Sequence, residues 1–154
     1  MAAETQARPK AEIFELKAPL LSLGRDNWPM VRTDLMSLTL KVYAEGGEKA
    51  MHYHTNEEHA FIVLQGEATF HLDSDGNAQV VHQWQGVFLP KGAQYYFQSS
   101  GNENLVLLRV GAPGNRAGGD GRLDPTGNLL IGHSEANKHI DGVAIEGKFF
   151  GRRV

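Results

Sequence analysis

Residues 46–66 read GGEKAMHYHTNEEHAFIVLQG, and the prediction of the fold starts from this stretch. It contains two short runs with strand character, residues 51–53 and 59–65, with glycines before the first run and directly after the second. Glycine and asparagine favour turns because they tolerate positive φ or bond their own backbone. The pattern predicts two strands joined by a turn through Asn56, which would bring His59 back beside His52 and His54.

The same alternation of apolar runs and turn residues continues on both sides, from Leu35 to Val110. The other runs predicted to be strands are 35–44, 68–72, 79–84, 87–89, 95–98 and 105–110. Many short strands at this spacing, with little helical periodicity, indicate an all-β protein built as an antiparallel barrel or sandwich.

The length of 154 residues fits one domain. We expect residues 1–34 to form an N-terminal arm and edge strands, and residues 35–110 to form the barrel. The last 44 residues hold 10 of the 18 glycines, which predicts a C-terminal tail over 111–154 that packs on the barrel or on a dimer partner. Within that tail, residues 134–138 are predicted to form one helical turn with Ser134 as its N-cap.

The composition excludes several classes of function. A net charge of −3 gives no basic footprint for nucleic acid. Because the sequence has neither a secretory signal pattern nor an apolar run of membrane-spanning length, we expect a cytoplasmic protein without a membrane partner. Cysteine is absent, which removes disulfides and thiolate ligands. Any metal must therefore be held by nitrogen or oxygen.

Three of the seven histidines fall within eight residues, at His52, His54 and His59. Residues two apart on a strand point to the same face, about 6.5–7 Å apart along it, so His52 and His54 can converge on one ion. Three imidazoles on one face suit Fe, Zn, Ni, Mn or Cu and leave positions open for water or substrate. The alternative interpretation is a set of surface histidines on an exposed hairpin.

The spacing Gly46-x5-His52-x-His54-x4-His59-x6-Gly66 resembles the first cupin motif, G-x5-H-x-H-x(3,4)-E-x6-G. The match includes both glycines and both leading histidines. The resemblance implies a small antiparallel jelly-roll (cupin) β-barrel, a homodimer, with a divalent transition metal at its inner face.

Pro90-x-Gly92-x2-Tyr95 is similar to the second cupin motif, P-x-G-x2-H. His59 therefore stands where the family has glutamate, and Tyr95 stands where it has histidine. The resemblance implies His52 and His54 as metal ligands, with His59 as a ligand by position. It implies Tyr95 as a hydrogen-bond donor, a weak fourth ligand or a catalytic group that handles protons.

The exchange of a carboxylate for a neutral imidazole leaves the metal with its full charge, which favours an anionic or chelating small molecule. A chain that has lost its metal is the alternative. Glu58 is a reserve ligand if the strand bulges, because it otherwise points away from the face of His59. Tyr43 is predicted to be a core residue, and the charged run 122–124 is predicted to be solvated. The remaining histidines are predicted to lie outside the site: His71, His82, His133 and His139.

These patterns together favour a metal-dependent small-molecule enzyme of cupin type. The leading hypothesis is Fe(II) dioxygenase-like chemistry at the three-histidine site, on a chelating oxygen substrate. The alternatives are a Zn or Ni Lewis-acid isomerase, cyclase or hydrolase, a non-catalytic cupin that binds a small ligand, and a metal-free scaffold that acts through its dimer surface.

Overall fold

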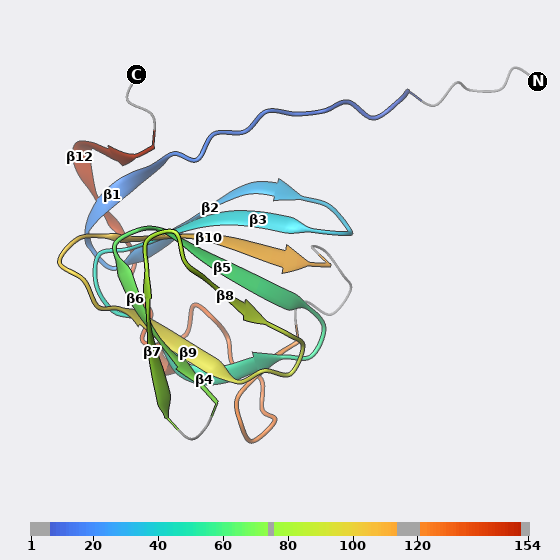
Figure 1. The fold of residues 1–154 in the computed structure, drawn as a ribbon, viewed down its shortest axis with the longest axis vertical. Coiled ribbons are helices and arrows are strands. Elements are labelled where there is room, and N and C mark those ends of the chain that lie inside the picture. The colour runs from blue at the N-terminus through green and yellow to red at the C-terminus, as the bar shows by residue number, and fades with distance from the viewer. Residues whose placement is uncertain (1–6, 74–75, 114–120, 152–154) are drawn as a thin grey trace, which may run out of the picture.

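The computed structural model describes residues 7–73, 76–113 and 121–151. Two five-stranded antiparallel sheets face each other (Figure 1). The first sheet has the order β2 (Arg25–Arg32), β3 (Ser37–Tyr43), β10 (Leu105–Ala112), β5 (Glu58–Gln65) and β8 (Gly86–Leu89). The second has the order β11 (Arg122–Leu123), β4 (Gly47–His54), β9 (Tyr95–Ser99), β6 (Glu67–Leu72) and β7 (Asn77–His82). The predicted all-β antiparallel jelly-roll class is confirmed.

The predicted strands 51–53 and 59–65 correspond to β4 and β5, but the two strands do not pair with each other. β4 pairs with β9 in the second sheet, and β5 pairs with β10 and β8 in the first. The turn through Asn56 therefore crosses from one sheet to the other. His54 and His59 meet across the interior, with ring centroids 4.2 Å apart.

The interior between the sheets is an aromatic and aliphatic core. Strand alternation places His59, Phe61 and Val63 of β5 on the inner face. Phe97 of β9 packs against Phe61 at 5.3 Å and stacks on Phe70 of β6 at 4.9 Å. Because His59 is the first inward residue of β5, the histidines lie where this core gives way to polar side chains.

The outer face of the first sheet is covered by the two ends of the chain. β1 (Ala18–Leu23) pairs antiparallel with β12 (Val143–Phe150). Leu21 of β1 and Leu40 and Val42 of β3 belong to one buried cluster on this side. The apolar runs that the sequence places near 143–150 thus form a strand that pairs with the N-terminal segment. The division of the chain at residues 34 and 110 stays a prediction.

The chain from β11 to β12 is tied to the body by Arg25. Its guanidinium donates to the carbonyl of Gly132 at 3.0 Å and to that of Asn137 at 3.4 Å, and its Nε donates to His139 Nδ1 at 3.0 Å. Asn137 is fully buried and accepts a hydrogen bond from the backbone N–H of Ala50 at 3.2 Å. These bonds hold the tail against β4.

The helical turn expected at 134–138 is a short 3-10 helix, η1 (Glu135–Asn137). Ser134 occupies the N-cap position as predicted, although its side chain makes no capping hydrogen bond. Its hydroxyl donates instead to the carbonyl of Ile131. Over the residues described, none of the helical structure has the length and apolar character needed to cross a membrane.

Candidate metal centre and its cavity

Three strands bring His54, His59 and Tyr95 together. His54 ends β4, His59 follows the first residue of β5, and Tyr95 begins β9. The Tyr95 hydroxyl lies 3.4 Å from His54 Nε2 and 3.4 Å from His59 Nδ1. All three side chains are buried. Two imidazole nitrogens and a phenol oxygen therefore converge on one small volume.

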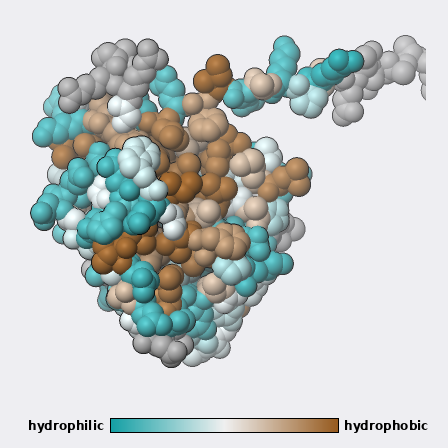
Figure 2. Space-filling model, viewed as in Figure 1, coloured by the Kyte–Doolittle hydropathy of each residue, from teal (hydrophilic) through white to brown (hydrophobic). Residues whose placement is uncertain are grey.

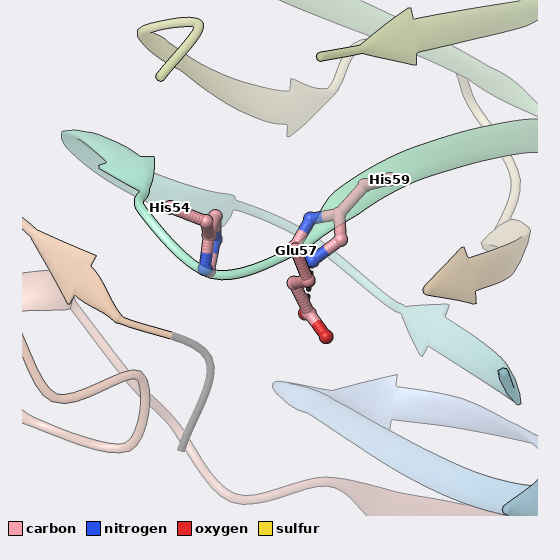
Figure 3. A group of neighbouring side chains, drawn as sticks. All are labelled: His54, Glu57 and His59. Atoms are coloured by element: carbon pink, nitrogen blue, oxygen red, sulfur yellow. Dashed lines mark hydrogen bonds and ion pairs between the residues drawn. The ribbon is translucent and has the colours of Figure 1, made fainter. Parts of the chain in front are cut away.

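Glu57 adds a carboxylate that the sequence reasoning did not select. It lies in the crossing turn, is buried, and accepts hydrogen bonds from His59 Nε2 and Arg109 Nη2. His54, Glu57 and His59 each offer a ligand atom within 4.8 Å of the others. Figure 3 shows Glu57 against His59, with His54 on the neighbouring strand end. Two histidines and a carboxylate form a ligand set suited to divalent transition metals.

The carboxylate of Glu57 can act in two ways. It can bind a metal together with His54 and His59. Alternatively, it can accept the Nε2 proton of His59 and so leave the Nδ1 lone pair facing Tyr95, as carboxylates behind metal-bound histidines do. The Arg109 guanidinium neutralises the carboxylate in either case.

His52 is fully buried, and its protonation is defined by a backbone carbonyl. Its Nδ1 lies 2.7 Å from the carbonyl oxygen of Ala50, so Nδ1 carries the proton and Nε2 keeps its lone pair. Among the residues that the structure describes, Nε2 has no hydrogen-bond partner. The ring packs on Tyr95 at 4.3 Å and lies 5.2 Å from His54. The close ligand group is nevertheless the one with Glu57, and a ligand role for His52 stays a prediction.

Burial keeps the imidazoles neutral, which metal binding requires. It lowers the pKa of His52 to about 3, and the nearby Arg122 guanidinium acts in the same direction. It also lowers the pKa of His59 to about 4, although the hydrogen bond to Glu57 opposes that shift. Both side chains can therefore offer a lone pair at neutral pH.

The reserve ligand Glu58 is exposed, one residue away from the carboxylate that is buried. Glu58 belongs to β5, where alternation places it opposite to His59, whereas Glu57 precedes the strand and escapes that constraint. His82 is exposed and pairs with Glu67 at 3.2 Å. His71 stacks on Tyr96 at 4.1 Å. Both of these histidines lie outside the site, as expected.

A cavity of about 390 Å³ opens beside His54, His59 and Tyr95. Residues 129–133 of the tail form one wall, and the other lining residues include four cationic side chains: Arg25, Lys41, Arg109 and Arg122. The expectation that the run 122–124 is solvated was wrong for Arg122, whose side chain is only 11% exposed. Its strand, β11, pairs with β4 at His54, and this pairing directs the arginine inward.

Glu48 is the carboxylate among the cavity-lining residues. It accepts a hydrogen bond from Lys41 Nζ, and its Oε2 lies 3.6 Å from Arg122 Nη1 and 3.8 Å from His52 Nε2. Burial by itself would raise the pKa of Glu48, but Lys41 and Arg122 hold it well below its usual range. Burial lowers the pKa of Lys41 to about 8, against the opposing effect of Glu48.

The tail also contributes side chains that the sequence analysis placed outside the site. His133 lines the cavity and packs edge-on against His139 at 4.7 Å. His139 in turn contacts Arg25 and lies 2.8 Å from an Asp141 carboxylate oxygen. No local sequence pattern in the glycine-rich tail predicts these contacts.

A usable signal did exist for Lys41 and Arg109. Lys41 interrupts the apolar run of β3 and shares its inward face with Tyr43. Arg109 continues the inward face of Leu105 and Leu107 in β10. A charged residue at an inward position of a core strand marks either a buried ion pair or a binding site.

Comparisons with known proteins agree with this geometry. The family model for the cupin domain matches residues 39–111. A protein with a double-stranded beta-helix domain from Klebsiella pneumoniae is 22% identical, and the alignment covers 61% of this chain and 81% of that chain with a TM-score of 0.54. A search of curated protein sequences gave no significant match.

Two enzymes of known structure share the fold over shorter parts of their own chains. Oxalate decarboxylase from Bacillus subtilis is 20% identical over 64% of this chain and 28% of that chain, with a TM-score of 0.52. A recombinant oxalate oxidase in complex with glycolate is 17% identical over 66% of this chain and 55% of that chain, with a TM-score of 0.53. The chain thus spans less than a third of the decarboxylase and about half of the oxidase.

The two facing antiparallel sheets and the histidines at their inner face define a double-stranded β-helix protein with a candidate metal centre. Residues 39–111 match the cupin domain, which identifies this part of the chain as a member of the cupin superfamily.

Proposed function

We propose that the protein is a metal-dependent enzyme that acts on a small, oxygen-chelating substrate, with dioxygen-dependent cleavage at Fe(II) as its leading chemistry. The observation that carries the proposal is the convergence of two buried imidazoles, the Glu57 carboxylate and the Tyr95 hydroxyl beside a cavity. A purely structural core has no need of this many polar groups.

The residues present fit a divalent transition metal. His54 and His59 would hold it, with Glu57 or His52 as the third ligand. His52 Nε2 supports this fit, because it is a buried lone pair without a hydrogen-bond partner among the described residues. A bound metal would polarise the oxygens of the substrate as a Lewis acid, and Fe(II) would add reactivity toward O₂.

The side chains around the centre have separate tasks in this proposal. Tyr95 holds a proton at its hydroxyl, within 3.4 Å of both histidines, and can deliver it to a substrate oxygen in the cavity. Arg109 holds Glu57 in place through a direct ion pair. Residues 129–133 form one wall of the cavity and would contact a substrate bound there.

The two oxalate enzymes support the proposal by analogy. The decarboxylase contains Mn(II) centres, and the oxidase has been seen with glycolate. The shared fold therefore accommodates both a transition metal and a small oxygen-rich ligand. Fold similarity at this level of identity does not transfer the reaction.

Metal analysis tests the proposal directly. The purified protein, loaded anaerobically with Fe(II), would be analysed by elemental mass spectrometry beside His54→Ala, with His71→Ala as the matched control. We expect one metal per chain in the wild type and in the control, and loss of the metal in His54→Ala. A wild-type protein without stoichiometric metal would overturn the proposal.

Oxygen consumption distinguishes the possible chemistries. A panel of diketones, catechols and hydroxy acids would be screened with the Fe(II)-loaded protein in an oxygen electrode. Uptake that depends on both His54 and a panel compound is expected. A metal-loaded protein that converts compounds without oxygen uptake would indicate a Zn or Ni Lewis-acid isomerase, cyclase or hydrolase. Binding without turnover would indicate a ligand-binding cupin.

We also propose a homodimer in which the N-terminal arm contacts the second copy. Residues 7–15 run away from the two sheets, and Ile13 on this arm is fully exposed (Figure 1). Figure 2 shows apolar side chains gathered across the middle of the same face, and Trp84 and Phe88 are exposed. Burial of such surface favours association. Light scattering is expected to give twice the chain mass, and Ile13→Asp is expected to shift the protein toward monomer.

A further inference from the structure

Tyr43 is one of the cavity-lining residues, and its buried hydroxyl has no hydrogen-bond partner among the described residues. The side chain is 1% exposed and lines the cavity from β3, two residues along from Lys41. A buried hydroxyl without a partner carries a free-energy penalty, so its presence in a core position indicates a ligand that accepts a hydrogen bond from it. A phenylalanine would fill the same space without that penalty.

The charge around Tyr43 defines the kind of acceptor. Four cationic side chains line the cavity, whereas the nearby carboxylates are Glu48 in the lining and Glu57 beside it. Each carboxylate is already engaged by a cation, Glu48 by Lys41 and Glu57 by Arg109. With His52 and His59 neutral, the described residues leave an excess of two positive charges on the cavity. An anion is the ligand that such a surface binds.

The walls and the volume narrow the class of anion. A cavity of about 390 Å³ is at the small end of the usual range for ligand sites. Residues Leu129, Leu130 and Ile131 give one wall an apolar surface, which suits a carbon skeleton better than an inorganic anion. The metal-ligand group and the cation-lined part adjoin in the same cavity, so one short molecule can reach both.

We infer that the ligand of this cavity is a short-chain organic acid, whose carboxylate is bound by Lys41 and Arg122 and accepts a hydrogen bond from the Tyr43 hydroxyl. This inference rests on the proposed function, because it assigns the substrate class of the same centre. Arg122 is the suitable arginine for this role. It reaches the cavity from β11, where its Nη1 lies 3.6 Å from Glu48 Oε2, whereas Arg25 donates to three backbone carbonyls and Arg109 Nη2 donates directly to Glu57.

Tyr43→Phe is the sharpest test, because a structural role and a ligand-binding role change stability and affinity in different ways. Malonate, and malonamide as its uncharged analogue, would be titrated by calorimetry into protein loaded with redox-inert Zn(II) and into chelator-treated protein. We expect malonate to bind both forms, more weakly without Zn(II), and malonamide to bind far more weakly. Tyr43→Phe should lower the malonate affinity about 5- to 10-fold without lowering the melting temperature.

Two further variants complete the experiment. Arg122→Gln should lower the malonate affinity at least about 10-fold, since it removes a charged donor. Tyr96→Phe, the matched control on β9 outside the cavity, should change neither the affinity nor the melting temperature. Equal affinity for malonate and malonamide would overturn the inference. So would a Tyr43→Phe variant that binds malonate like the wild type.

The outcome separates this inference from the proposed function. If the protein holds no metal but binds malonate through Tyr43, the proposed enzymatic function is wrong and the acid-binding site stands. If the protein holds its metal but binds malonate and malonamide with similar affinity, the proposed metal centre stands. The assignment of an organic acid as the ligand is then wrong.

Discussion

The cavity has two sides that arise in different ways. The imidazole side comes from residues close together in sequence, where one turn between β4 and β5 carries His54, Glu57 and His59 into contact. The cationic side is assembled from β2, β3, β10 and β11, which extend from Arg25 to Arg122 along the chain. For example, Arg122 Nη2 lies 3.4 Å from His52 Nδ1, although the two residues are 70 positions apart in sequence.

The two sides therefore depend on different features of the fold. The imidazole side depends on strand alternation and one turn, so changes there should alter metal affinity with limited effect on anion binding. The cationic side depends on the packing of distant strands around buried charges, so removal of one partner of a buried ion pair there should lower the stability of the whole fold. Substitutions on each side test this division.

Removal of the Glu48 carboxylate is expected to have the largest effect on stability. Glu48→Gln leaves the Lys41 ammonium buried without its ion-pair partner. The free energy of unfolding should fall by about 3–5 kcal/mol, as is typical when one partner of a buried pair is removed. Urea denaturation measures it. The exposed carboxylate Glu58, changed to Gln, should shift stability by no more than about 0.5 kcal/mol. Equal losses of stability in the Glu48 and Glu58 variants would contradict the claim that the buried charges of the cationic side stabilise the fold.

Removal of a histidine ligand should have a smaller effect on stability and a large effect on metal affinity. His59→Ala is expected to weaken metal binding at least about 100-fold, whereas Tyr95→Phe should weaken it by less than about 10-fold, because a neutral phenol is a poor ligand. Competition against a fluorescent chelator measures both. Equal losses in the two variants would identify Tyr95 as a true ligand.

The role of Glu57 is tested by its amide. Glu57→Gln keeps the size of the side chain but removes the charge that Arg109 and His59 contact. If the carboxylate orients His59, metal affinity should fall about 10- to 100-fold while His54 and His59 still bind. X-ray absorption of the Zn-loaded variant would then show unchanged nitrogen coordination. The loss of an oxygen ligand from that spectrum would instead identify Glu57 as a direct ligand.

The smallest expected effect is a pH dependence on the cationic side. Burial lowers the pKa of Lys41 to about 8, so the side chain is charged below that pH and loses its charge as the pH rises through it. Malonate affinity should therefore fall a few-fold between pH 7 and pH 9.5. In Lys41→Arg the charge persists over this range, and the affinity should stay level. A wild-type affinity that is flat with pH would exclude Lys41 from the anion site.

Much of the fold could be predicted from short stretches of sequence. The alternation in 59–65 predicted β5 and its inward face, and the glycine at position 66 marked its end. Residue 84 shows the limit of such reasoning: Trp84 was expected to end a strand, but it lies beyond β7 in a turn with φ of 69°. Left-handed backbone at a bulky residue is unusual, and no propensity predicts it.

The candidate site could be predicted only in part, for a physical reason visible at two residues. His54 and His59 follow from spacing, because alternation sets the face of each strand residue. Glu57 lies in a turn, where alternation gives no direction, and Glu58 was kept as a reserve ligand because a strand bulge could have turned it inward. The buried carboxylate became evident only once Arg109, 52 residues away in sequence, was seen to contact it.

The sequence by itself determined the strands, the antiparallel class and the nitrogen donors, because these depend on periodicity, turn residues and spacing within a few positions. The tertiary structure alone decided that β4 and β5 lie in facing sheets, and that Lys41, Tyr43 and Arg122 share one cavity with the histidines. Those relations depend on strand pairing between distant segments, and short-range patterns carry no information about which distant strands will meet.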